Sequence, residues 1–227
     1  MNAVRIAVDP VASLRPADLH AIAELLDRTY AGIDPAQVAR DLSDKTHVLR
    51  LFIADRLHGL TTFAYGRSQW RGESVGVIWS GDTVVEAAAR HAAHWPAHWM
   101  HAVREAHGGR GRLAWNLICS DARTWRFQTA CLRRSVPHDD DTELSALCAQ
   151  LSRERYGRHF SHGIVRLAAP QRLRRREALA QSGAAALEAR FAALNPGWRE
   201  GDELACAGWL DPRGFTPLAL RWWTALP

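Results

Sequence analysis

One stretch of the sequence, residues 73–107, limits the fold more than any other. It opens with an apolar segment typical of a buried strand, which is interrupted at Ser80-Gly81-Asp82-Thr83 and continues to Val85. Pro96 then starts a helical pattern that reaches His107. A strand that leads into a helix is a common phosphate-binding arrangement, because the first helical N–H groups lack intrahelical partners. The glycines that usually let the backbone approach a phosphate are missing here.

The hydrophobic pattern elsewhere predicts a mixture of strands and helices. The predicted order is strand 4–8, helices from Pro16 and from Asp34-Pro35, strands 47–54, 60–65 and 75–85, helix 96–107, strand 113–119 and helix 121–132. A turn over 55–59 should join two of the strands into a hairpin. This alternation predicts an α/β (α+β mixed) fold rather than an all-α or all-β one.

The chain after Pro137 has a different pattern. It contains an acidic turn at 139–141, helices near 144–151 and 184–194, strands near 164–167 and 204–210, and an arginine-rich run at 172–176. No low-complexity linker separates it from the rest. We therefore predict a core domain over residues 1–136 and a C-terminal extension, 137–227, packed on the same core.

Composition narrows the cellular setting. The apolar runs are too short to span a bilayer, and the N-terminal residues have the pattern of a strand rather than a signal peptide. Four cysteines without Cys-x-x-Cys spacing are typical of reduced thiols. These features predict a cytoplasmic protein with no membrane partner. The sequence also lacks the Walker, Rossmann and Gly-x-Ser-x-Gly motifs.

Two residue types are unusual in frequency. Lys45 is the only lysine among 29 basic residues, and the net charge is +5. An arginine-rich chain indicates either a solvated basic surface or an anionic partner, since arginine binds phosphate bidentately. Ten tryptophans are present, and two or three of them are expected on a pocket wall. Six fall within residues 70–125: Trp70, Trp79, Trp95, Trp99, Trp115 and Trp125.

Residues 1 to about 135 resemble the GNAT N-acyltransferase superfamily in their order of elements. The family's loop, Arg/Gln-x-x-Gly-x-Gly/Ala, aligns with Arg90-His91-Ala92-Ala93-His94-Trp95, in which the arginine matches while Ala93 and Trp95 replace the small residues. The segments 80–85, 117–120 and 195–204 also look like a divergent group of bacterial GNAT-like proteins. The resemblance implies a central mixed, mostly antiparallel sheet flanked by helices, and a CoA or carrier-protein thioester held between two strands that splay apart.

The resemblance also implies roles for individual residues. Asp82 would be the general base, and Ser120 or Cys119 would replace the tyrosine that often acts as general acid. The remaining expected contacts are Arg90, His91, His94, Asn116, Val84 and Val85 for the donor, and Trp79, Ser80, Trp115 and Trp125 for the substrate. The alternatives are that Asp82 only bonds amides within a bulge and that Cys119 is a buried structural thiol.

Three functions follow as hypotheses. The first is acyl transfer from a CoA or acyl-carrier-protein thioester to an amine or hydroxyl of a small molecule. The second is an aminoacyl-tRNA-dependent transferase on the same fold, favoured by the altered loop and the arginine excess. The third is a non-catalytic small-molecule binder. No metal is expected, because the histidines at 91–101 lack a third ligand at fixed spacing. Another copy of the chain, forming a homodimer, is among the expected partners.

Overall fold

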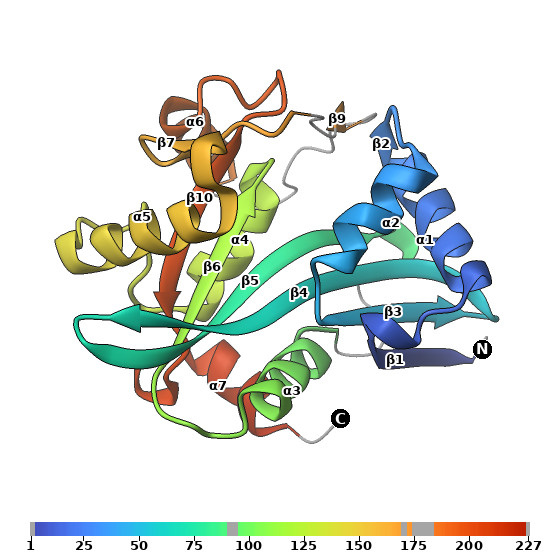
Figure 1. The fold of residues 1–227 in the computed structure, drawn as a ribbon, viewed down its shortest axis with the longest axis horizontal. Helices are drawn as coiled ribbons and strands as arrows, with labels where there is room; N and C mark the ends of the chain where they lie inside the picture. The colour runs from blue at the N-terminus through green and yellow to red at the C-terminus, as the bar shows by residue number, and fades with distance from the viewer. Residues whose placement is uncertain (1–2, 90–94, 169–171, 174–183, 226–227) are drawn as a thin grey trace.

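An eight-stranded sheet runs through the computed structural model, which describes residues 3–89, 95–168, 172–173 and 184–225 (Figure 1). The strand order is β1-β3-β4-β5-β6-β10-β8-β7, and only the β5–β6 pair is parallel. A mixed, mostly antiparallel sheet is thereby confirmed. Its strands are β1 (Val4–Pro10), β3 (His47–Ile53), β4 (Arg56–Trp70), β5 (Glu73–Val85), β6 (Leu113–Cys119), β7 (Phe160–Ser161), β8 (Ile164–Val165) and β10 (Glu203–Trp209). Outside this sheet, β2 (Tyr30–Ala31) pairs with β9 (Arg172–Leu173).

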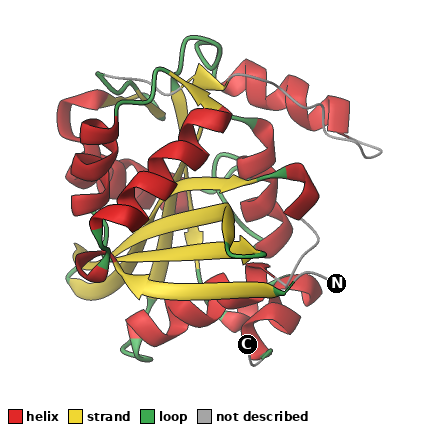
Figure 2. Ribbon diagram, turned by 90° about the vertical axis from the view of Figure 1, so that its right-hand side faces the viewer, coloured by secondary structure: helices red, strands yellow, loops and turns green. Residues whose placement is uncertain are grey.

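Helices cover both faces of the large sheet (Figure 2). One face carries α1 (Pro16–Thr29), α2 (Pro35–Ser43) and α5 (Thr142–Tyr156). The other carries α3 (Trp95–His107), α4 (Ala122–Cys131), α6 (Ala184–Leu194) and α7 (Pro217–Thr224). Alternation along β5 separates the two cores: Val77 packs on the α5 side and Ile78 on the α3 side, both fully buried.

The predicted helix starts at Asp34 and Asp121 are confirmed. The Asp34 carboxylate accepts from Ala36 N–H, and the Asp121 carboxylate accepts from Arg123 and Thr124 N–H. These bonds satisfy N–H groups that the first helical turn leaves unpaired. The sequence signal for a cap is local, which explains why it succeeds here.

The hairpin between β3 and β4 differs from the prediction. Its turn is only Ala54-Asp55, with φ of 49° and 63°, so β4 begins at Arg56 and runs to Trp70. The predicted turn at 55–59 was too long, and the predicted strand at 60–65 was too short. Helix α7 was not predicted; it begins where Thr216 Oγ1 accepts from Ala219 N–H ahead of a proline.

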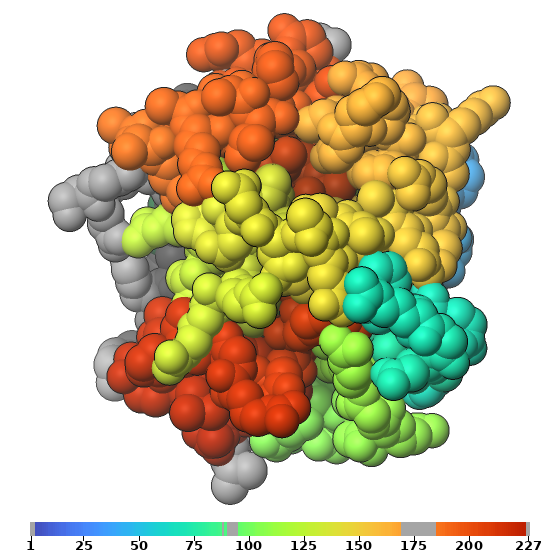
Figure 3. All heavy atoms as spheres, turned by 90° about the vertical axis from the view of Figure 1, so that its left-hand side faces the viewer, coloured from blue at the N-terminus to red at the C-terminus, as the bar shows by residue number. Residues whose placement is uncertain are grey.

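The chain after residue 136 joins the same sheet. β10 lies between β6 and β8, and α5 packs across β6 and β10. Figure 3 shows α5 in yellow, with the β4–β5 hairpin in teal and the C-terminal segment in red around it. Within the described part of the chain, no helix combines the length and apolar character that a bilayer crossing requires.

Candidate functional site

β5 and β6 run together for only part of their length. Their register extends from Gly76↔Leu113 to Trp79↔Asn116 and stops there. β5 nevertheless continues to Val85 and β6 to Cys119, so the two strands diverge from this point (Figure 1). A cleft of about 830 Å³ opens between them. Strand edges facing such a gap offer backbone N–H and C=O groups to a ligand.

A β-bulge lies on β5 beside the divergence. Phe63 pairs with Ser80 and Thr61 with Thr83, so that Gly81 and Asp82 together oppose one β4 residue. A Cβ added at Gly81 would meet the Thr62 hydroxyl and come within 2.5 Å of Lys45 Cε. Glycine therefore suits the bulge, because the alkyl chain of Lys45 crosses this position and any larger residue would displace it and Thr62.

Aromatic side chains form much of the cleft wall. The ring centroids of Trp99 and Trp115 lie 4.7 Å apart, and Phe127 meets both edge-on. The Trp115 indole N–H donates to Ser80 Oγ at 2.8 Å, which fixes the orientation of the ring. Further contributions come from α1, the end of β5, α3, α4, α6 and the loops after β6 and α6: Arg28, Val84, Val85, Glu86, Trp95, Ser120, Arg123, Phe191, Trp198 and Arg199.

Tyr30 is a cleft residue that sequence reasoning missed. It follows α1, is buried, and its hydroxyl hydrogen-bonds with Ser120 at the end of β6. Burial, with nearby Asp82 and Asp121, raises its pKa well above the ordinary value, so the phenol stays protonated. No local pattern marks this tyrosine, because only the tertiary structure brings the end of α1 to β6.

Asp82 belongs to a charged cluster with Lys45 and Glu203. Asp82 and Glu203 keep a little solvent contact but are surrounded by protein, and this burial raises the pKa of both, that of Glu203 to about 8. Lys45 opposes the shift at both carboxyls, and burial lowers its own pKa. A carboxyl group with a raised pKa is suited to accept a proton near neutral pH.

The structure brings five of the predicted residues to the cleft, and five other described ones are not among the residues that line it. Ser80, Val84, Val85, Trp115 and Ser120 line the cleft. Asp82, the predicted base, lies between the lining residues Gly81 and Thr83 without lining the cleft itself. The other four have partners in the interior: Trp79 donates to Leu151 C=O, Asn116 to Ser152 Oγ and Cys206 C=O, Cys119 Sγ lies 3.7 Å from Cys206 Sγ, and Trp125 is fully buried near Phe191. Asn116 and Trp79 differ from their neighbours because alternate strand residues face opposite sides of the sheet.

Cys119, expected either as a general acid or as a structural thiol, and the predicted phosphate loop have different outcomes. Cys119 is fully buried, and burial together with Cys206 raises the pKa of its thiol, which opposes formation of a reactive thiolate. Arg90, His91 and His94 lie outside the described residues. Among residues that the structure does describe, no group of three or more His, Cys, Asp or Glu side chains is arranged to hold a metal ion.

A second cavity, of about 930 Å³, lies at the other end of the β5–β6 pair. Its arginines already have partners: Arg213 pairs with Asp211 at 2.6 Å and Arg134 pairs with Asp141. Arg112 stacks over the Trp209 ring, 3.7 Å from its centroid. The fourth arginine of this cavity, Arg133, donates to Phe215 C=O, so each of the four has a partner within the protein.

No family model matches the chain, and no curated protein does. Three of the solved structures that it resembles are N-acyltransferases by description. A probable N-acyltransferase from Enterococcus faecalis is 9% identical with a TM-score of 0.44, over 58% of this chain, which spans only 33% of that protein. A GNAT family N-acetyltransferase from Escherichia coli in complex with CoA is 16% identical with a TM-score of 0.40, over 56% of this chain and 68% of its own. An IAA acetyltransferase from Bacillus cereus is 12% identical with a TM-score of 0.39, over 92% of this chain and 100% of its own.

Proposed function

We propose that the chain is an acyltransferase that moves an acyl group from a CoA thioester to the amine of a small molecule. The observation that supports it most is the parting of β5 and β6 after Trp79 and Asn116. A pantetheine arm is a chain of amides, so it can hydrogen-bond to strand edges in the way an added strand does. This inference depends on the chain's own geometry.

The cleft suits the donor in volume and in wall chemistry. Its apolar aromatic walls fit an extended, partly apolar arm. Arg123 and Arg199 also line it, and guanidinium groups bind phosphate oxygens bidentately. Arg28 lines the cleft as well and bonds Glu86 at 2.7 Å and Leu57 C=O at 3.0 Å.

Two groups from separate elements take part in the proposed reaction: Tyr30 in the cleft wall, after α1, and Asp82 on β5, between the cleft residues Gly81 and Thr83. The acceptor nitrogen attacks the thioester carbonyl carbon, the C–N bond forms, and the C–S bond breaks. In this proposal Asp82 takes the proton from the attacking amine. The Tyr30 hydroxyl, positioned by Ser120, stays protonated and donates a hydrogen bond to the departing thiolate, which takes its proton from solvent.

The proposal is tested by thiol release from acetyl-CoA and longer acyl-CoAs with a panel of amines and alcohols. Donor binding is followed separately through tryptophan fluorescence, since Trp99 and Trp115 lie on the cleft wall. We expect CoA binding and acceptor-dependent thiol release. CoA binding without turnover of any acceptor would favour a non-catalytic small-molecule binder. If CoA does not bind and an acyl carrier protein or aminoacyl-tRNA supports transfer instead, that molecule is the donor.

A further inference from the structure

β1 forms one edge of the sheet, and among the described residues no strand pairs with its outer side. Its register with β3 decides which backbone groups point outward. Ala54 N–H donates to Ala3 C=O, and at the other end Val11 N–H donates to Thr46 C=O. Odd-numbered residues of β1 therefore bond β3, and Val4, Ile6 and Val8 direct their N–H and C=O groups outward, while Pro10 offers only its C=O.

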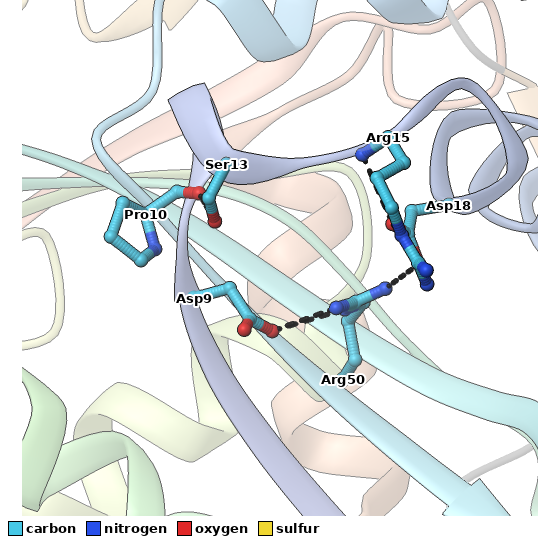
Figure 4. Close-up of polar contacts among 6 residues, drawn as sticks. All are labelled: Asp9, Pro10, Ser13, Arg15, Asp18 and Arg50. Carbon is cyan, nitrogen blue, oxygen red and sulfur yellow. Dashed lines mark hydrogen bonds and ion pairs between the residues drawn. The ribbon is translucent and has the colours of Figure 1, made fainter.

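The side chains of β1 divide between the two faces of the sheet. Arg5 lies over the Phe52 ring, 4.0 Å from its centroid, and Asp9 bonds Arg50, which also bonds Asp18 of α1 (Figure 4). Both contacts of Asp9 with Arg50 use Oδ2, at 2.8 and 3.2 Å. Arg5 and Asp9 thus share the α1 face of the sheet.

On the opposite face, Val4 and Val8 are 43% and 40% exposed. They flank Ile6, which is only partly buried. An outward row of backbone donors beside exposed apolar side chains is a template for strand pairing.

We propose that a second copy of this chain pairs with β1, antiparallel, with the two-fold axis at Ala7. This register sets Arg5 opposite Asp9 of the other copy, twice by symmetry, and Ile6 opposite Val8. It also pairs outward backbone groups with outward backbone groups, which antiparallel ladders require. Moving the axis to Ile6 would set Arg5 opposite Ala7 and lose both ion pairs. The sequence of the edge is self-complementary only in the first register.

A disulfide at the axis tests the register directly. Opposed residues in a non-hydrogen-bonded antiparallel pair have Cα atoms about 4.5 Å apart, within disulfide range. The native cysteines are at most 6% exposed. Under mild oxidation we expect Ala7→Cys to give a covalent dimer and Ser145→Cys, at an exposed position on α5, to stay monomeric. Equal or absent cross-linking in the two variants overturns the proposed register.

Sedimentation velocity tests the interface without cross-linking. The wild-type chain should sediment at twice its 25.3 kDa mass. Val8→Pro removes an outward N–H and should weaken dimerisation at least tenfold, while Val8→Thr keeps the N–H and should remain dimeric. Arg5→Asp should also weaken it, through like-charge opposition. Circular dichroism melting checks that each variant is folded. The proposal is contradicted if the wild-type chain is a monomer at about 100 micromolar, or if folded Val8→Pro is still a dimer. Acyl transfer is measured separately, so this result does not depend on the proposed activity.

Discussion

The two ends of the β5–β6 pair carry cavities of similar volume, about 830 and 930 Å³, with opposite chemical character. At the end where β5 and β6 stay paired (the closed end), Arg134 and Arg213 pair with Asp141 and Asp211. At the end where the strands part (the open end), the neighbouring carboxyl groups have raised pKa values because burial is only partly compensated. Volume alone therefore does not distinguish the two cavities, whereas the parting of the strands and the incompletely compensated charge do.

The largest expected effect is a loss of acyl-transfer activity on substitution near the open end but not at the closed end. Asp82→Asn should lower the turnover of acyl transfer by ~10²–10⁴-fold, the usual contribution of a general base. Asp211→Asn, at the closed end, should stay within a few-fold of wild type. Burial raises the pKa of Asp82, so the rise of wild-type kcat/KM with pH should occur at a higher pH than the ordinary pKa of an aspartate. Steady-state rates across pH measure this, and an unchanged Asp82→Asn profile would remove Asp82 from the mechanism.

Tyr30→Phe should have the next largest effect. Loss of the hydroxyl that bonds Ser120 removes the hydrogen-bond donor to the departing thiolate but leaves the ring in the wall, so kcat should fall by ~10–10²-fold with little change in KM. Tyr65→Phe, whose hydroxyl lies 3.4 Å from His107 away from the cleft, is the matched control. A loss confined to KM, or equal losses in both variants, would contradict a role of Tyr30 in stabilising the leaving thiolate.

Gly81→Ala should cost ~1–3 kcal/mol of unfolding free energy, because the new Cβ overlaps Thr62 and Lys45 in the bulge. Gly214→Ala, at the closed end, meets nothing within 4 Å and should be nearly neutral. Chemical denaturation compares the two variants. Equal stability would mean that the bulge can relax around an added methyl group.

Glu203→Gln should stabilise the protein at alkaline pH. The folded-state pKa of Glu203, about 8, exceeds the ordinary value of 4.5, so the folded state holds the proton more tightly and wild-type stability falls as pH rises between these values. Removing the charge should therefore gain ~1–2 kcal/mol above pH 8 and nothing below pH 4, a range reduced for the group's residual solvent contact.

Asp211 should change the stability with pH in the opposite direction to Glu203. Arg213 lowers its pKa, so the pair stabilises the folded state above the ordinary aspartate pKa and is lost on acidification. Thermal melts from pH 2 to 9 should show Glu203→Gln gaining on the wild type as pH rises from about 4.5 to about 8, and Asp211→Asn losing on it as pH rises to the ordinary aspartate pKa of 3.8 and staying level above. If the stability of both variants, relative to the wild type, changes with pH in the same direction, the two cavities do not differ in their electrostatics as described.

The smallest effect concerns the cleft wall. Trp115→Phe deletes the indole N–H bond to Ser80 and should cost ~1 kcal/mol of stability. Donor binding should weaken modestly, since the wall remains aromatic. Trp209→Phe, whose ring stacks with Arg112 at the closed end, should leave donor affinity unchanged. Calorimetric titration with a CoA thioester distinguishes these outcomes.

Local chemistry accounts for what the sequence predicted well. The caps at Asp34 and Asp121, the glycine-dependent break in β5 and the extent of α6 all depend on residues within a few positions of each other. The far end of β4 escaped prediction because its polar residues Arg67, Ser68 and Gln69 lack the alternation of a half-buried strand.

The sequence by itself determined the order of most elements and the polar break at Gly81-Asp82, because periodicity and capping depend on neighbouring residues; the mixed sheet was expected from the family resemblance. Only the tertiary structure decided which side chains meet. It brought Tyr30 to Ser120, Lys45 across Gly81 and Glu203 to Asp82, from elements far apart in the chain. It also turned Asn116 and Trp79 away from the cleft, because the face that a strand residue occupies depends on register and on the point where two strands part.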